Sequence, residues 1–250
     1  MTQPPPGKEF FLDAVRREGE VFLATARSAD LTAPVPSCPK WTVWDLVRHL
    51  GVVYNWQRTH FVRDETTEPT HERTTAPDGE AVFDWFAAEH AEILSSLAGL
   101  DPQARAWNWS VQPETAAFWF RRMAHETVVH RWDAQSAAGL PTPVEPALAT
   151  DGVSEVLEVF LPGGRRKGPD DRDGVVRLLA TDTETEWAVR VRGTATSVLD
   201  TDTVFDAGPG AQAAAGGTAS DVLLALWGRV PFDVLRVEGD PGLLEALRTG

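Results

Sequence analysis

Residues 114–138 read ETAAFWFRRMAHETVVHRWDAQSAA, and this stretch predicts one long helix with a patterned face. Glu126 and His130 are four residues apart, so they share one side of such a helix. Apolar or small side chains recur on that side at helical spacing, and they are Phe120, Met123, Thr127 and Ala134. The stretch therefore predicts a helix that carries a carboxylate and an imidazole toward a protein interior.

Three more helices are predicted ahead of this one, over residues 8–29, 42–63 and 79–97. The second begins at Thr42, a good helix cap, and Asp45 three residues later can complete a capping box. The long connection 98–113 carries Trp107 and Trp109. We expect their side chains to line a substrate pocket, to form a lid or to pack in the core. Four such helices predict an all-α four-helix bundle for residues 1–142.

From residue 143 onward the pattern changes to short strands and short helices. Helices are predicted over 146–160, 219–227 and 241–248, and strands over 175–180, 187–191, 203–205 and 234–237. Residues 181–184 read as the turn between the first two strands. The Ala/Gly-rich segment 207–217 is too short to call a linker. Residues 143–250 therefore predict a small α+β domain.

His49 is the third candidate ligand of a possible metal site, beside Glu126 and His130. It lies three residues after Leu46 and four before Val53, on the apolar face of the second helix. One histidine from one helix and a Glu126/His130 pair from another make the arrangement of a three-ligand metal site with open positions. The simpler interpretation is a hydrogen-bonded core histidine beside a chance Glu/His pair. His125, about 140° from His130 around the helix, is expected to be a neighbour rather than a ligand.

Other side chains near these positions have both a structural and a functional interpretation. Asp45 and Asp133 could orient the ligands from behind, although Asp45 is more simply a helix cap. Cys38 could be a nucleophile, but no activating partner is evident in the sequence, which favours an incidental role. Trp41 and Trp44 flank the start of the second helix, and core packing is favoured over ligand stacking for both.

Arginines could bind an anionic ligand. Arg229 ends a predicted helix, where a cation suits the helix C-terminus, and its alternative role is to bind an anion. Arg121 and Arg122 could serve similarly, but we expect both to be solvated.

Composition excludes several classes of partner. The chain has 250 residues, one cysteine and a formal net charge of −14, which argues against nucleic acid or an anionic membrane. It has neither a secretory leader nor a long apolar segment, so we expect a cytoplasmic protein. The sequence does not indicate the oligomeric state.

Three blocks of sequence together resemble one known family. They are VPSCPKWTV at 35–43 leading into DLVRHLG at 45–51, HETVVHRWDA at 125–134, and GTASDVLLALWGR at 217–229 followed by VEGD at 237–240. In this order they resemble the signatures of the mycothiol-dependent maleylpyruvate isomerase family. The resemblance implies a DinB-like metal-binding four-helix bundle followed by a small α+β domain similar to sterol carrier folds.

The resemblance also implies site residues and a cofactor. By position, His49, Glu126 and His130 match the metal ligands, with zinc as the expected divalent metal, and Arg229 matches an arginine to which we assign anion binding. Members use the thiol mycothiol as co-substrate, either to isomerise maleylpyruvate to fumarylpyruvate or to transfer the thiol to electrophiles. The expected chemistry is addition of a metal-bound thiolate to a small-molecule electrophile or unsaturated acid.

Two other functions remain open from the sequence. A metal-dependent hydrolase on the same bundle would activate water instead of a thiol. A non-catalytic module would bind its ligand in the second domain and keep a purely structural metal. The signature residues do not separate isomerase from S-transferase, and they do not name the substrate.

Overall fold

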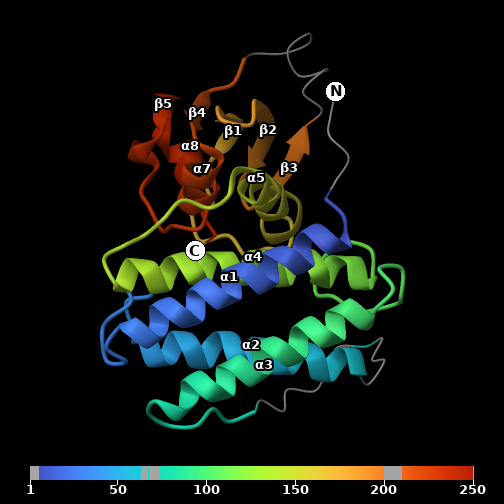
Figure 1. Ribbon diagram of the computed structural model, residues 1–250. Coiled ribbons are helices and arrows are strands. Elements are labelled where there is room, and N and C mark those ends of the chain that lie inside the picture. The colour runs from blue at the N-terminus through green and yellow to red at the C-terminus, as the bar shows by residue number, and fades with distance from the viewer. Residues whose placement is uncertain (1–5, 63–66, 68–73, 200–209, 250) are drawn as a thin grey trace. The chain divides into compact units, whose positions relative to one another are not determined.

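Four long helices form the first half of the chain, α1 (Lys8–Ser28), α2 (Val43–Val62), α3 (Ala81–Gly99) and α4 (Ala116–Ala137). The computed structural model describes residues 6–62, 67, 74–199 and 210–249. Figure 1 shows the four helices as a bundle, in which α1 packs mainly on α4 and α2 mainly on α3. Large apolar side chains fill the space between them, including Phe22, Tyr54, Phe86, Trp119 and Phe120. The predicted four-helix bundle is confirmed.

The start of α2 is fixed by the capping box that the sequence predicts. The Thr42 backbone N–H donates to Asp45 Oδ2 at 3.0 Å, and the Asp45 N–H donates to Thr42 Oγ1 at 3.3 Å. Each side chain satisfies a helix-end donor that has no partner within the helix. Asp45 is therefore a helix cap, and it sets the first turn of the helix that carries His49.

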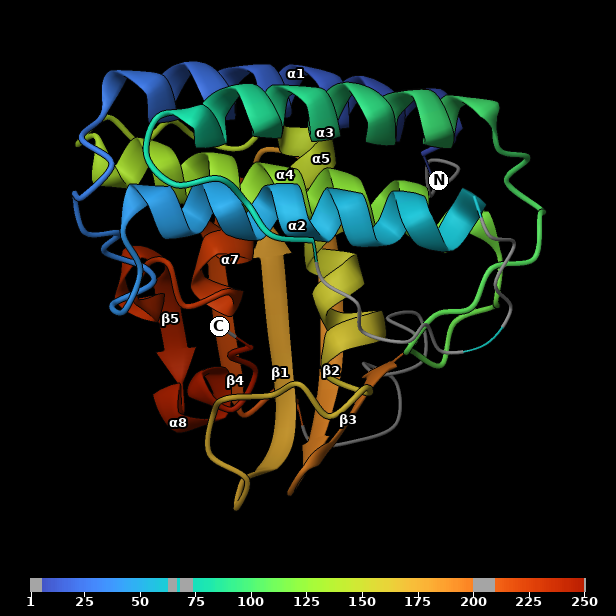
Figure 2. The same ribbon diagram turned by 90° about the horizontal axis from the view of Figure 1, so that it is seen from below.

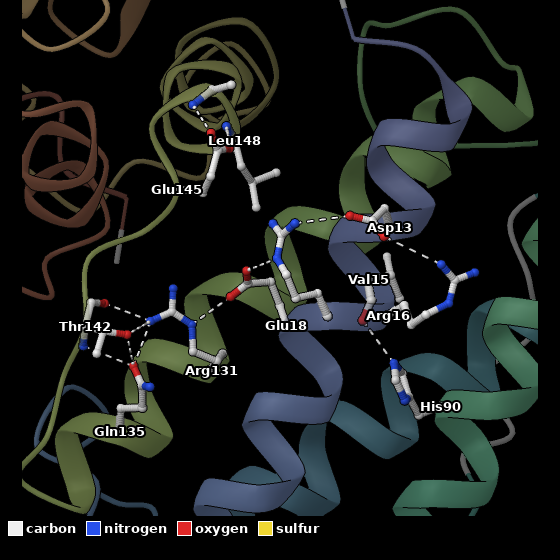
Figure 3. A network of polar contacts seen from close by, with 12 residues as sticks. Asp13, Val15, Arg16, Glu18, His90, Arg131, Gln135, Thr142, Glu145 and Leu148 are labelled. Atoms are coloured by element: carbon white, nitrogen blue, oxygen red, sulfur yellow. Dashed lines mark hydrogen bonds and ion pairs between the residues drawn. The ribbon is translucent and has the colours of Figure 1, made fainter.

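A buried polar network between α4 and α1 fixes how α4 is rotated about its own axis (Figure 3). Arg131 Nε donates to Glu18 Oε2 at 2.8 Å, and Arg131 Nη1 donates to Gln135 Oε1 at 2.7 Å and to the Thr142 carbonyl at 2.8 Å. Both charged groups are buried, so each needs the other and these neutral partners. Because Arg131 follows His130 directly, the network also fixes where His130 lies on the bundle.

The rest of the chain forms a second unit. The contacts divide the chain into Met1–Thr142 and Pro143–Gly250. Helix α5 (Pro146–Glu155) continues into a π-helical turn, η1 (Val156–Phe160), and packs against α7 (Ala219–Leu226). The described residues of this unit also form η2 (Phe232–Val234) and α8 (Pro241–Glu245).

A five-stranded mixed sheet runs in the order β3-β2-β1-β4-β5, as Figure 2 shows from right to left. The strands are β1 (Asp173–Ala180), β2 (Thr185–Arg192), β3 (Ala195–Leu199), β4 (Ala213–Gly217) and β5 (Arg236–Gly239). Only β1 and β4 pair in parallel, and the other pairs are antiparallel. Helices α7 and α8 pack on β1 and β4. The predicted α+β class is confirmed.

Two strands were missed by sequence reasoning. Strand β4 reads AAAGG and has no alternation of apolar and polar residues to detect. A Cβ at Gly217 would come within 2.5 Å of Leu235 Cδ2. Strand β3 is short and largely exposed, so it also lacks a strong pattern. The strand predicted over 203–205 lies outside the described residues, and the one predicted over 234–237 starts two residues later, after η2.

No helix in the described part of the chain combines the length and hydropathy needed to cross a membrane.

Candidate metal centre

Three side chains from two helices converge at one point of the bundle. His49 lies on α2, and Glu126 and His130 lie one turn apart on α4. One ligand atom from each of the three lies within 4.8 Å of the others. The two imidazole Nε2 atoms both face Glu126 Oε1, at 3.1 Å from His49 and 3.3 Å from His130. The structure thus brings together the three residues that spacing had singled out.

The cluster is closed on one side and accessible on the other. The His130 side chain is 8% exposed, whereas His49 is 33% and Glu126 is 20% exposed. Solvent can therefore reach His49 and Glu126, whereas His130 is buried. This arrangement is typical of catalytic metal sites, which keep open positions, rather than of closed structural ones.

Behind His130 lies a buried carboxylate. Asp133 Oδ2 is 2.8 Å from His130 Nδ1, and Asp133 has no exposed surface. The Ser37 hydroxyl donates to the other oxygen, Oδ1, at 2.5 Å. When His130 Nδ1–H donates to this carboxylate, the Nε2 lone pair is directed to the cluster, which is how histidine ligands are usually oriented. The second of the two predicted orienting carboxylates, Asp133, therefore lies where that role requires.

Charge inside the cluster favours an ionised Glu126 and a protonated His130 when no cation is present. Burial would raise the pKa of Glu126, but hydrogen bonds from His130 and His49 hold it well below its usual range, aided by the charges of His130 and Arg122. Burial would lower the pKa of His130, but its hydrogen bonds to Asp133 and Glu126 and their charges raise it to about 9. In metal-free protein, His130 therefore carries a proton at the position where a bound metal would contribute positive charge.

The donor set fits a divalent metal. Two imidazole nitrogens and one carboxylate oxygen face a common point, and one of the histidines has a carboxylate behind it. Such a set suits zinc, and it also accepts other first-row divalent ions. His49, Glu126 and His130 are the residues that could hold such an ion.

An indole ring covers the two histidines. The Trp41 ring centroid is 4.7 Å from that of His49 and 6.1 Å from that of His130. Trp41 is half-buried and lies in the segment just before α2. Sequence reasoning favoured core packing for Trp41, and the structure places it instead as an aromatic wall of the cluster.

Arg122 was wrongly expected to be solvated. Its side chain is 4% exposed, and Nη2 donates to Glu126 Oε2 at 2.9 Å. The i, i+4 spacing between Arg122 and Glu126 was a signal in the sequence. It could have identified this contact, because the residue four positions after Arg121 is His125 and not a carboxylate.

Two other histidines whose side chains the structure describes, His125 and His90, lie away from the cluster. His125 is buried with its ring edge-on to Phe11 of α1, at 6.1 Å between centroids, and is not part of the cluster. His90 Nε2 bonds the Val15 carbonyl at 2.9 Å. The side chains of His60 and His71 lie outside the described residues.

Two further residues that the sequence singles out, Cys38 and Arg229, have contacts that fit structural roles. Cys38 is half-buried in the turn before α2, where its backbone N–H donates to the Val35 carbonyl. In the second unit, Arg229 Nη1 donates to the Trp227 carbonyl at 3.0 Å, at the end of α7, and the guanidinium lies 5.7 Å from the Trp227 ring centroid. The contact with the last turn of a helix is the simpler of the two interpretations of Arg229.

The tryptophans of the connection 98–113 cover the start of α4. Trp119 Nε1 donates to the Trp107 carbonyl at 2.8 Å, and Trp109 packs edge-on against Phe118 at 5.9 Å between centroids. These contacts fit packing on the bundle end.

Comparisons with known proteins assign the two parts of the chain to the two domains of one family. Residues 12–135 match the model of the mycothiol maleylpyruvate isomerase N-terminal domain, and residues 147–246 match the model of the C-terminal domain of the same family. The search of curated proteins found no match.

Solved structures show the same fold. A crystal structure of the mycothiol-dependent maleylpyruvate isomerase is similar at TM-score 0.58 and 12% identity. A histidine-to-alanine mutant of that enzyme is similar at TM-score 0.65 and 11% identity. Each match covers 93% of this chain and 93% of the other. At such low identity the similarity establishes the fold alone.

Proposed function

The chain belongs to the mycothiol maleylpyruvate isomerase family of enzymes, and from this membership we propose that it is a metal- and mycothiol-dependent isomerase or S-transferase. The observation that carries the proposal is the convergence of His49 Nε2, Glu126 Oε1 and His130 Nε2 on one partly open point. The substrate is a small electrophile such as an unsaturated acid, and the cytoplasm, where thiols stay reduced, is the proposed location.

The three side chains would hold one divalent metal, with zinc as the expected ion. Bound there, the metal supplies positive charge at an open position, which lowers the pKa of an incoming thiol so that it reacts as thiolate near neutral pH.

The chain's own residues prepare the site for this chemistry. Asp133, held by Ser37, keeps the proton of His130 on Nδ1 and leaves Nε2 available as a ligand. Trp41 covers the rings of His49 and His130 and limits water on that side. Together they fix two of the three ligands before any substrate arrives.

The thiolate sulfur then adds to one carbon of the substrate's activated double bond, and the electron pair of that bond moves onto the conjugated carbonyl oxygen. Isomerisation follows if the resulting single bond rotates and the same thiolate is expelled, which restores the double bond with the opposite geometry. Thiol transfer follows if the adduct takes up a proton instead. Arg229 is proposed to bind the substrate carboxylate or the developing negative oxygen.

An activity assay tests the proposal and separates it from its rivals. Metal-loaded protein is incubated with maleylpyruvate or another unsaturated acid, with and without mycothiol, and products are identified by mass and retention time. Isomer formation or a thiol adduct that requires mycothiol supports the proposal and also distinguishes the two reactions. Turnover that is equal without thiol would contradict it and favour a metal-dependent hydrolase. Ligand binding without turnover, surviving His49→Ala, would favour a non-catalytic module.

A further inference from the structure

The two oxygens of Glu126 have different partners. Oε1 faces both histidines, at 3.1 Å from His49 Nε2 and 3.3 Å from His130 Nε2. Oε2 accepts a hydrogen bond from Arg122 Nη2 at 2.9 Å. Only one of the two oxygens is therefore directed to the point where the three candidate ligands meet.

We propose that Arg122 is a positioning residue that restricts Glu126 to one-oxygen coordination and so keeps a ligand position open for the thiol. This inference rests on the proposed function, because it assigns a role toward the metal that His49, Glu126 and His130 would hold. It concerns the carboxylate's mode of binding, which the ligand set alone does not determine.

The hydrogen bond from Arg122 favours this choice. Arg122 and Glu126 are four residues apart on α4, so the helix itself keeps the two groups within reach. A hydrogen bond between two charged groups is shorter and about twice as strong as a neutral one. If Glu126 turned Oε2 toward a metal, the buried guanidinium would lose this partner, and weakening the pairing of a buried charge is costly.

Arg122 also sets the charge of the site. The formal charges of Glu126 and Arg122 cancel, and the two ligand histidines are neutral when they bind a metal. With Asp133 counted as the buried carboxylate behind His130, a divalent ion would leave the site with a net charge of +1, which would lower the pKa of a bound thiol. Without Arg122, the negative charge of Glu126 would offset more of the positive charge of a bound metal.

Replacing Arg122 should separate metal affinity from activity. In Arg122→Met, removal of a nearby positive charge should leave Co²⁺ or Zn²⁺ affinity unchanged or higher. Mycothiol-dependent turnover should fall about ten- to a hundredfold, as is usual when a partner of a metal ligand is removed. Arg122→Lys keeps the charge and one donor, and it should recover part of the turnover. Arg16→Met, which removes an exposed arginine paired with Asp13, is the matched control and should change neither quantity.

The visible spectrum of Co²⁺-loaded protein reports the coordination directly. Wild type should show the stronger absorption of a low coordination number, and Arg122→Met should show weaker absorption because Glu126 adds a second oxygen. An unchanged spectrum in Arg122→Met with Co²⁺ bound would overturn the inference, as would parallel loss of metal and activity, which marks a merely structural role.

A measurement on wild-type protein needs no variant that could misfold. The Zn²⁺-minus-metal-free infrared difference spectrum, assigned with Glu126→Gln, should show the wide splitting of carboxylate stretches that marks one-oxygen binding. A narrow splitting would contradict the inference while leaving the proposed function intact. Wild type that binds neither Co²⁺ nor Zn²⁺ would overturn both.

Discussion

Asp133 Oδ2 lies 2.8 Å from His130 Nδ1 at the closed side of the candidate metal centre. Asp133 is fully buried, and its other oxygen accepts from Ser37. Through Ser37 the pair links the ligand histidine to the loop between α1 and α2, so the site is built from α2, α4 and this loop. Its consequence is an imidazole with a defined tautomer and a defined orientation.

Asp133→Asn should weaken metal binding. An amide nitrogen can donate to Nδ1, which would place the His130 proton on Nε2, where the metal must bind. We expect about a ten- to hundredfold loss of Zn²⁺ affinity, measured by competition with a chromogenic chelator. Asp84→Asn, at an exposed carboxylate on α3, is the control. Equal affinities in wild type and Asp133→Asn would contradict the orienting role.

Metal binding should release a proton near neutral pH. The pKa of His130 is raised to about 9, above its usual value of 6.5, so metal-free protein at pH 7 carries the proton that a metal must displace. Calorimetry in buffers of different ionisation enthalpy should show release of about one proton per Zn²⁺ at pH 7. The release should decline as pH rises through about 9, because the folded, metal-free histidine is then already neutral. No release at pH 7 would contradict this charge state.

The Glu18–Arg131 pair should matter for stability. Their side chains are 8% and 3% exposed, so removing Arg131 leaves the buried Glu18 carboxylate with the half-exposed Arg17, 3.3 Å from its other oxygen, as a weaker charged partner. Arg131→Met should lower the free energy of unfolding by about 3–5 kcal/mol, measured by urea denaturation of metal-free protein.

The exposed pair of Arg16 and Asp13 provides the comparison for that experiment. Arg16→Met should change the free energy of unfolding by less than about 1 kcal/mol. A double variant, Glu18→Gln with Arg131→Met, should be less destabilised than the sum of the two single changes. Simple additivity would show that the two groups do not depend on each other.

Arg229 should affect turnover more than folding. If it binds the substrate's anionic group, Arg229→Met should lower kcat/KM for an unsaturated acid about a hundredfold or more. The loss should be much smaller for an uncharged, ester-masked electrophile. A change in thermal stability with equal kcat/KM for both substrates would instead support the simpler role at the end of α7.

Spacing along the chain indicated the bundle and singled out the members of the cluster, and the family resemblance then favoured them as metal ligands. The four-residue interval between Glu126 and His130, and the place of His49 on an apolar face, indicated which side chains share a direction. The capping residues Thr42 and Asp45 gave the start of α2 to within one residue. These are local signals, and helices carry them well.

Contacts between distant segments were not predictable. Ser37 and Asp133 are 96 residues apart, and only the folded chain shows that they meet. The burial of the Arg122 side chain depends on tertiary packing around Glu126. Strand β4 reads AAAGG, so nothing in its pattern distinguishes it from a loop. Each of these features depends on neighbours contributed by remote parts of the sequence.

The most direct test of the account is the metal content of purified protein, wild type against His130→Ala, after reconstitution with Zn²⁺ and removal of excess. Elemental analysis should find about one equivalent in wild type and a large loss in His130→Ala, while His90→Ala, at a histidine outside the cluster, retains it. Wild-type protein without metal, or a His130→Ala variant that keeps a full equivalent, would contradict the three-ligand site and the thiolate chemistry built on it.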